Sequence, residues 1–261
     1  MTHNLEHLID LEAHPLGDTT YQARMRAAFD ETGVLCLDSF LTKKALAQLV
    51  AEAQACAPLA HFTNSTHNVY LTPPDDSLPQ THVYNRQITS SKGCITTDQV
   101  PKESGLHRLY HDEDFKAFIC AIVGQAAVYP YADPLSSINV HYAHHGQELG
   151  WHFDNSSFAI TLLLQAPEAG GQFEYVKDLR DADKGEMNFG AVADVLDQKT
   201  APTILDINPG TLVLFRGRNA MHRVTPTIGD KTRYLVVLAY NDAPDIALSP
   251  SARMTFFGRL G

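Results

Sequence analysis

Apolar residues recur at helical spacing in the first half of the chain. Tyr21, Met25, Ala28 and Phe29 fall on one face of an amphipathic helix, and Gly33 follows as a stop signal. An apolar run at residues 34–37 predicts a short strand. Two further helices are predicted by the same spacing: Leu46, Leu49, Val50 and Ala53 after a capping Thr42, and Phe115, Phe118, Ile119 and Ile122 between Asp112 and Gly124.

The pattern changes near residue 136, where short β-rich runs alternate with turn clusters. Strands are predicted at residues 138–142, 159–165, 172–176, 203–206, 211–215 and 234–240. Strong turn signals at 167–171 and 208–210 punctuate them. Many short strands with such turns favour an antiparallel sandwich or barrel. The fold class is therefore predicted as mostly β with flanking helices, with an N-terminal helical layer packed on the β part rather than two separate domains.

A long polar stretch separates the second and third predicted helices, from about residue 61 to residue 109. It contains the clusters Pro73-Pro74-Asp75-Asp76 and Ser90-Ser91-Lys92-Gly93. Loops of this length inside a domain are usually functional or mobile. The stretch is predicted to be a loop that partly covers a site.

Charge and composition indicate which kinds of partner, such as nucleic acids, membranes or small molecules, the protein is expected to bind. Of 261 residues, 20 are Lys or Arg and 30 are Asp or Glu, which gives a net charge of −10 and argues against binding to nucleic-acid phosphates. No apolar run is long enough to span a membrane, and the N-terminus does not resemble a signal peptide. The four cysteines form no C-x-x-C pair and are expected to be reduced. A cytoplasmic protein with a small-molecule substrate is expected, and its oligomeric state stays open.

The clearest candidate chemistry lies in the segment Gly150-Trp151-His152-Phe153-Asp154. Residues two apart on a strand point to the same face, so His152 and Asp154 can converge on one metal ion. His222, after a second predicted strand, is the best candidate for a third ligand. Two imidazoles and one carboxylate on one face of an ion are diagnostic of non-haem Fe(II) oxygenases, because they leave positions open for a cosubstrate and oxygen.

An isolated H-x-D pair is weak evidence in a chain with 13 histidines. His111-Asp112, for example, falls at a predicted helix start and not on a strand. The strand context of His152 and the downstream His222 make coincidence a poor explanation. Arg233, eleven residues after His222, adds a guanidinium that can clamp a carboxylate with two parallel hydrogen bonds.

Several motifs follow one another in a fixed order between residues 136 and 241. They are Tyr142-x-x-x-Gly146, His152-x-Asp154, Thr161-Leu162-Leu163-Leu164, Gly170-Gly171-x-Phe173, Pro209-Gly210-Thr211-Leu212-Val213-Leu214-Phe215, His222-Arg223-Val224-Thr225-Pro226 and Arg233-Tyr234. In order and spacing they resemble the prolyl-hydroxylase-like branch of Fe(II)/2-oxoglutarate-dependent dioxygenases. Phe215-Arg216-Gly217-Arg218, followed by the His222 motif, is most similar to the subgroup that acts on free amino acids, which contains halogenases and hydroxylases.

The resemblance implies a double-stranded β-helix, or cupin-like jelly roll, in a single domain over residues 1–261. Residues 1–135 would form a helical and lid part, 136–245 the jelly-roll core with the metal site, and 246–261 a C-terminal segment. His152, Asp154 and His222 would hold Fe(II), with 2-oxoglutarate and O2 as cosubstrates. Arg233, helped by Tyr142, would bind the distal carboxylate of 2-oxoglutarate.

The resemblance also bears on the reaction. Halogenases of this subgroup carry a small residue in place of the carboxylate ligand, and halide fills that coordination position. Because this chain has Asp154, hydroxylation of an unactivated C–H bond of a small polar metabolite is expected, with release of succinate and CO2. The alternatives are a related oxidative cyclase or desaturase on the same scaffold, and a non-catalytic metal-binding β-barrel that senses a ligand.

The candidate substrate contacts are Arg86, Trp151 and Asn155. Arg86 lies in the predicted cover and is suited to holding a carboxylate, with a solvated loop arginine as the alternative. Trp151 either lines the pocket or fills the barrel wall. Asn155 falls on the opposite face of an ideal strand unless a turn brings it inward. The segment Asn155-Ser156-Ser157-Phe158 lacks the acidic residue that the resemblance implies just after the motif in lysine-handling relatives, so lysine is disfavoured as the substrate.

Overall fold

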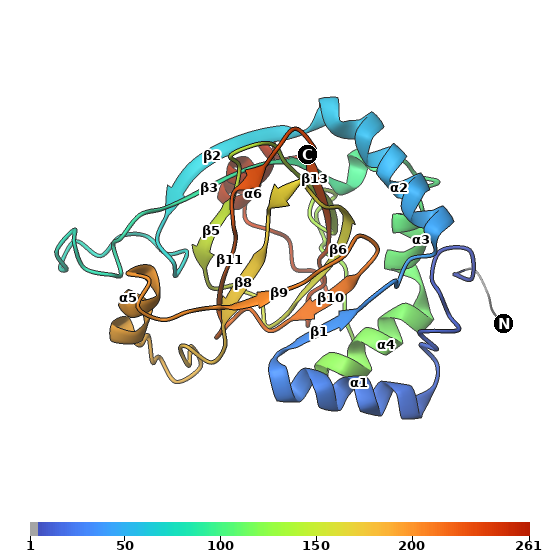
Figure 1. Ribbon diagram of the computed structural model, residues 1–261, viewed down its shortest axis with the longest axis horizontal. Helices are drawn as coiled ribbons and strands as arrows, with labels where there is room; N and C mark the ends of the chain where they lie inside the picture. The colour runs from blue at the N-terminus through green and yellow to red at the C-terminus, as the bar shows by residue number, and fades with distance from the viewer. Residues whose placement is uncertain (1–4) are drawn as a thin grey trace.

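The computed structural model describes residues 5–261, and a large antiparallel sheet occupies its centre (Figure 1). In the described residues the strands pair in the order β1-β10-β6-β13-β4-β3-β5-β11-β8-β9, and β2 pairs with β3. The short strands β12 (Thr227–Ile228) and β7 (Ala169–Gly170) form a separate pair. The bounds of the sheet strands are β1 Val34–Leu37, β2 His61–His67, β3 Ile88–Ile95, β4 Ile138–Ala143, β5 Leu149–His152, β6 Ala159–Gln165, β8 Phe173–Val176, β9 Thr203–Leu205, β10 Leu212–Phe215, β11 Met221–Val224 and β13 Arg233–Leu238.

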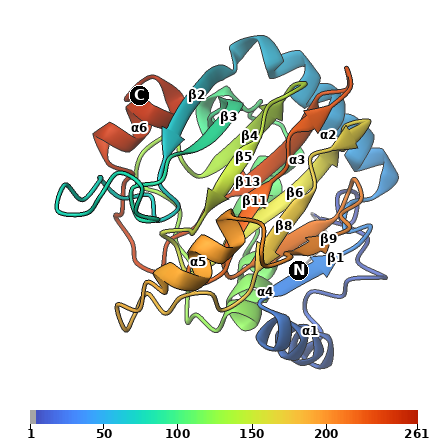
Figure 2. The same cartoon turned by 60° about the vertical axis from the view of Figure 1, so that its left-hand side comes forward.

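The sheet curves into two walls that meet where β3 pairs with β5. One wall runs from β1 to β3, and the other runs from β5 to β9; Ser90 of β3 pairs with Leu149 of β5 where the walls meet. Figure 2 shows the strands side by side across the molecule. This half-barrel of antiparallel strands confirms the predicted jelly-roll class.

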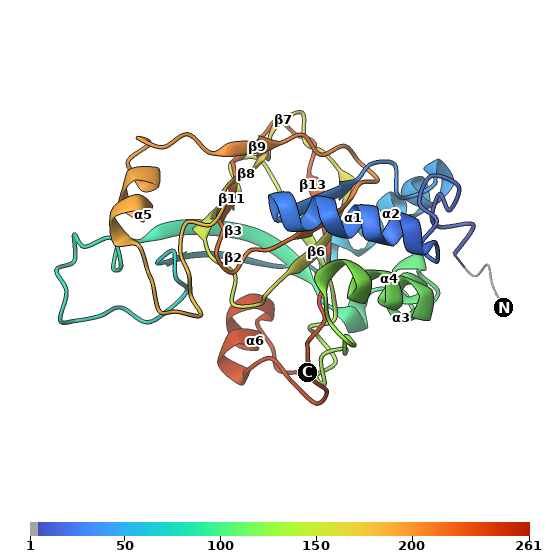
Figure 3. The ribbon, with the colours of Figure 1, turned by 90° about the horizontal axis from the view of Figure 1, so that it is seen from below.

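Helices cover the outer face of the first wall. They are α1 (Thr19–Thr32), α2 (Lys43–Cys56), α3 (Gly105–His111) and α4 (Glu113–Val123), and Figure 3 shows them gathered on one side of the sheet. The predicted caps are confirmed. Thr42 accepts a hydrogen bond from the Ala45 N–H at 3.2 Å, and Asp112 accepts one from the Phe115 N–H at 3.0 Å.

Strand alternation places the helices and the cavity on opposite faces of the first wall. Alternate residues of β4, β6, β10 and β13 pack into the core beneath the helices, and the intervening residues face an internal cavity. The core set is Ile138, Val140, Tyr142, Ile160, Leu162, Leu164, Leu212, Leu214, Tyr234, Val236 and Leu238. The cavity set is His141, Ala159, Thr161, Leu163, Val213, Phe215, Arg233, Leu235 and Val237.

The interpretation of residues 61–109 as one long loop is wrong. The segment holds β2, β3, the single turn η2 (Thr97–Gln99) and the start of α3, and a further single turn, η1 (Ala57–Leu59), precedes it. The apolar pattern does not reveal β2 because, within residues 5–261, β3 is the one strand that pairs with it and its side chains are largely exposed. Its sequence HFTNSTH therefore needs few apolar residues. Residues 68–87 do form a loop between the two strands.

Two further helices lie outside the predicted set. They are α5 (Phe189–Leu196), beside the 68–87 loop, and α6 (Pro250–Phe257), which contacts β2 and β3. All four cysteines are free thiols, as expected. None of the helices in residues 5–261 combines the length and apolar character that a bilayer span requires.

Candidate metal centre and substrate cavity

Three side chains converge inside the half-barrel. His152 ends β5, Asp154 follows two residues later, and His222 lies opposite His152 on the paired strand β11. The Asp154 Oδ1 atom lies 3.6 Å from Nε2 of His152 and 3.5 Å from Nε2 of His222. All three ligand atoms fall within 4.8 Å of one another, which is close enough for one ion to contact them all. The structure therefore brings together the three residues that the sequence predicts as ligands.

Backbone carbonyls fix the orientation of both imidazoles. Nδ1 of His152 lies 2.8 Å from the Gly150 carbonyl oxygen, and Nδ1 of His222 lies 3.0 Å from the Ala220 carbonyl oxygen. A carbonyl oxygen can only accept, so in each ring Nδ1 must donate, and the proton sits there. Each Nε2 then presents its lone pair toward Asp154, which is the arrangement that metal-binding histidines adopt.

The protonation states also suit metal binding. Burial lowers the pKa of His152 below its usual value, and the neighbouring His222 lowers it further. Burial alone would raise the pKa of Asp154, but the attraction of His222 and His152 outweighs it and holds that pKa below its ordinary range. A neutral imidazole beside an ionised carboxylate is the state that a divalent metal ion requires.

Gly217 makes room for the Asp154 carboxylate. A Cβ atom on this glycine would lie 1.9 Å from Oδ2 of Asp154, which is far inside contact distance. Oδ2 is buried and has no hydrogen-bond partner in the described residues. A buried anionic oxygen without a partner is costly, so a cation bound beside it would be strongly favoured. Two nitrogen donors and one carboxylate on one face fit Fe(II).

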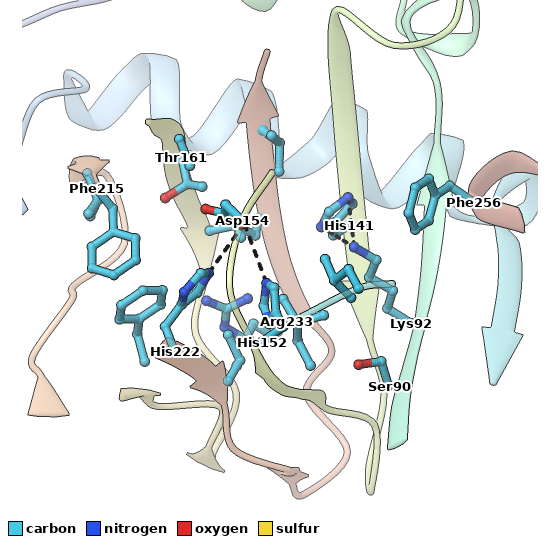
Figure 4. A pocket seen from close by; sticks show the side chains of 18 of the residues that line it. Ser90, Lys92, His141, His152, Asp154, Thr161, Phe215, His222, Arg233 and Phe256 are labelled. Carbon is cyan, nitrogen blue, oxygen red and sulfur yellow. Dashed lines mark hydrogen bonds and ion pairs between the residues drawn. The ribbon is translucent and has the colours of Figure 1, made fainter. Parts of the chain in front are cut away.

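The three residues open onto a cavity of about 300 Å³ (Figure 4). This volume is at the small end of the range typical of small-molecule sites, ~300–1,000 Å³. Its lining is mainly apolar, with hydroxyl groups contributed by Thr63, Ser65, Ser90, Thr161 and Thr255. The cavity thus suits a small, partly apolar ligand near the candidate metal centre.

Arg233 lines the same cavity from the first residue of β13. It is 7% exposed, and within residues 5–261 its guanidinium makes no hydrogen bond or ion pair. Burial lowers its pKa to about 10, so the group remains charged at neutral pH. An unpaired buried guanidinium is suited to a carboxylate that arrives with a ligand.

Lys92 of β3 and His141 of β4 are not among the site residues predicted from the sequence. Both line the cavity, and the Lys92 Nζ atom lies 3.3 Å from each ring nitrogen of His141. Lys92 was hidden in the stretch interpreted as a loop. His141 lies on the same face of the sheet as Arg233 because of the register between β4 and β13, which the sequence does not display.

Comparison with models of known protein families identifies the family to which this chain belongs. The family model described as Halogenase D matches residues 17–255, which is most of the chain. The chain belongs to the Halogenase D family. No curated protein matches it in sequence.

Solved structures that resemble this Halogenase D family member share its fold at low sequence identity. The α-ketoglutarate-dependent epimerase SnoN from nogalamycin biosynthesis is 14% identical, with a TM-score of 0.60 and coverage of 87% of this chain and 85% of SnoN. The carbocyclase SnoK from the same biosynthesis is 10% identical, with a TM-score of 0.57 and coverage of 83% and 82%. A Trichoplax adhaerens prolyl hydroxylase in complex with a hypoxia-inducible-factor peptide is 12% identical, with a TM-score of 0.53 and coverage of 87% and 95%.

Tyr142 does not lie in the cavity, and its predicted contact with the cosubstrate requires correction. The side chain is fully buried under the helices, and its hydroxyl donates to the Ala53 carbonyl oxygen of α2 at 2.8 Å. The reason is strand parity: Tyr142 pairs with Tyr234, the neighbour of the inward-facing Arg233. Both tyrosines therefore point to the opposite face.

The three predicted substrate contacts also lie away from the cavity lining. Arg86 forms an ion pair with Asp197 after α5, at 2.6 Å. Trp151 packs in the wall, where the Arg223 guanidinium lies 4.8 Å from its ring centroid. Asn155 is exposed, and only its backbone oxygen is engaged, by Arg218 at 3.1 Å. For Trp151 the wall alternative is the correct one.

Tyr142→Phe tests the corrected position of this side chain. The loss of a buried hydrogen bond is expected to lower the free energy of unfolding by about 1 kcal/mol. The affinity for 2-oxoglutarate should stay unchanged, because the hydroxyl is on the other side of the sheet. Urea unfolding and a 2-oxoglutarate titration measure the two quantities, and a weaker 2-oxoglutarate affinity at unchanged stability would contradict this placement.

Gly217→Ala tests the space around Asp154. The added methyl group must displace the carboxylate, so Fe(II) affinity should fall about tenfold or more. Anaerobic metal titration measures this affinity. Gly190→Ala is the matched control, because nothing lies within 4 Å of a Cβ atom there. Equal metal affinity in both variants would show that Asp154 is not a ligand.

Proposed function

We propose that this protein is an Fe(II)- and 2-oxoglutarate-dependent dioxygenase that hydroxylates an unactivated C–H bond of a small molecule, such as a free amino acid or a derivative. One observation carries the proposal: the His152, Asp154 and His222 ligand atoms meet in the same cavity as the unpaired Arg233 guanidinium. This combination offers a metal site and an anchor for a carboxylate cosubstrate. Membership of the Halogenase D family supports it.

The chain's own residues supply binding and orientation. His152, Asp154 and His222 would hold the iron, and Arg233 would hold the distal carboxylate of 2-oxoglutarate by two parallel hydrogen bonds. When bound, the iron would supply O2 activation: one oxygen atom would enter succinate as 2-oxoglutarate loses CO2, and the other would enter a substrate C–H bond to give the alcohol. The apolar lining, including Phe173 and Phe215, limits the access of water to this chemistry.

Asp154 favours hydroxylation over halogenation. A halogenase needs an open coordination position for halide, whereas here a carboxylate fills that place. Gly217 is fitted to this carboxylate, since any larger residue would collide with Oδ2. The site is therefore built around an acidic ligand.

The cavity favours a free small molecule over a peptide. Its volume of about 300 Å³ must hold the cosubstrate as well as the substrate. SnoN is described in complex with nogalamycin RO, and the Trichoplax adhaerens enzyme with a peptide, so related folds serve both kinds of substrate. The limited space here leaves room for a compact metabolite.

Substrate-stimulated succinate release tests the proposed activity. Purified protein with Fe(II), ascorbate and 2-oxoglutarate is screened against amino acids and their derivatives, and mass spectrometry should detect a product heavier by one oxygen atom. Asp154→Ala is expected to abolish succinate release, while the exposed control Asp242→Ala should retain it. A product that has lost two hydrogens would indicate the desaturase or cyclase alternative, and binding of a panel member without any succinate would indicate a ligand sensor.

Arg233→Met tests the cosubstrate anchor. Loss of a buried charge-assisted pair is expected to weaken 2-oxoglutarate binding roughly ten- to hundredfold. The exposed control Arg108→Met should bind it as the parent does. If Arg233→Met bound 2-oxoglutarate with the parent affinity, another cation would have to hold the cosubstrate.

A further inference from the structure

A second cationic group lies in the cavity, apart from Arg233. Lys92 of β3 and His141 of β4 face each other across the paired strands, with Nζ 3.3 Å from both imidazole nitrogens (Figure 4). On β4, His141 pairs with Leu235, whereas Arg233 pairs with Ala143. His141 is therefore offset from Arg233 by two residues, or about 7 Å, along the strands. Lys92 lies two residues before Cys94, the partner of His141, so it is level with Arg233 on the other side of β4, and two strand spacings, about 10 Å, separate their backbones.

Lys92 has donors that the protein does not satisfy. An ammonium group carries three N–H bonds, and a neutral imidazole offers only one lone pair. Within the described residues, Lys92 forms no ion pair and His141 is its one side-chain partner. At least two N–H bonds of a largely buried ammonium therefore remain for a ligand or water in the cavity.

The basic side chains that line the cavity favour the binding of an anion. Burial lowers the pKa of Lys92, and burial followed by the repulsion of Lys92 and Arg233 lowers the pKa of His141 well below its usual value. Among the described lining residues, Asp154 is the one carboxylate, and the proposed metal neutralises it. Two basic side chains thus share a poorly solvated space without an acidic partner, a cost that a bound anion would offset.

The same lining argues against a cationic substrate. An ammonium group on the substrate's side chain would find hydroxyl groups, such as those of Ser65 and Ser90, but no carboxylate free of the metal centre. Apolar side chains, among them Leu149, Leu163 and Phe256, offer room for a hydrocarbon body. The complementary ligand has an anionic end and an apolar remainder.

We propose that Lys92 and His141 form a carboxylate-binding subsite for the substrate, distinct from the Arg233 anchor for 2-oxoglutarate. This assignment of the substrate carboxylate to one subsite and the cosubstrate to the other rests on the proposed function, because that function assigns 2-oxoglutarate to Arg233. The subsite takes the role for which the sequence suggested Arg86. The substrate class is a small free acid, including amino acids with apolar side chains, and not a molecule whose acid group is amidated.

The test compares acids with their amides in a binding experiment that needs no turnover. Mn(II)-loaded protein saturated with 2-oxoglutarate is titrated calorimetrically with three matched pairs: L-leucine and L-leucinamide, L-norleucine and L-norleucinamide, and hexanoate and hexanamide. At least one acid should bind about tenfold or more tightly than its amide. Lys92→Met should remove this preference and leave the 2-oxoglutarate affinity within about twofold. The exposed Lys102→Met is the matched control.

Three results would overturn the subsite. One is that no acid of the panel binds the parent protein, and another is that acid and amide bind alike. The third is that Lys92→Met weakens 2-oxoglutarate as much as Arg233→Met does, which would assign the pair to the cosubstrate. If the proposed function were wrong, the Mn(II)-loaded parent protein would not bind 2-oxoglutarate. The acid and amide titrations can then still be made in the absence of 2-oxoglutarate, so the two failures are distinguishable.

Discussion

An ionised, partly buried carboxylate between two imidazoles is the constraint on which the site depends. Asp154 has one oxygen facing Nε2 of both His152 and His222, and its other oxygen has no partner in the described residues. The surrounding backbone holds both rings in the tautomer that directs lone pairs toward this point. Such a cluster is unfavourable alone and becomes favourable when a divalent cation joins it.

The fold builds the rest of the site through strand parity. On the first wall, one set of alternate side chains anchors the helices, and the other set lines the cavity. Arg233 and His141 belong to the second set and Tyr142 to the first. The helical layer thus stabilises the sheet without contributing side chains to the cavity, and the polar strands β2 and β3 add further lining residues.

Local signals explain which parts of the structure were predictable. Helix caps such as Thr42 and Asp112, and the spacing of His152, Asp154 and His222, are short-range features that the sequence displays directly. The outward orientation of Tyr142, by contrast, follows from the register between β4 and β13, which the sequence does not display.

Other features depend on contacts that no local pattern reveals. Arg86 is diverted from the cavity by Asp197, a partner 111 residues away in sequence. Lys92 was not predicted because β3 has a polar sequence and becomes buried only through tertiary packing. Its partner strand β2 is also polar, so the sequence does not indicate the hairpin that the two strands form.

An anaerobic crystal structure of the protein with Fe(II) and 2-oxoglutarate tests the central claim most directly. We expect one iron ion bonded to Nε2 of His152, Oδ1 of Asp154 and Nε2 of His222, with Arg233 paired to a carboxylate of 2-oxoglutarate. Iron bound elsewhere, or an ion at this position that lacks Asp154 as a ligand, would contradict it.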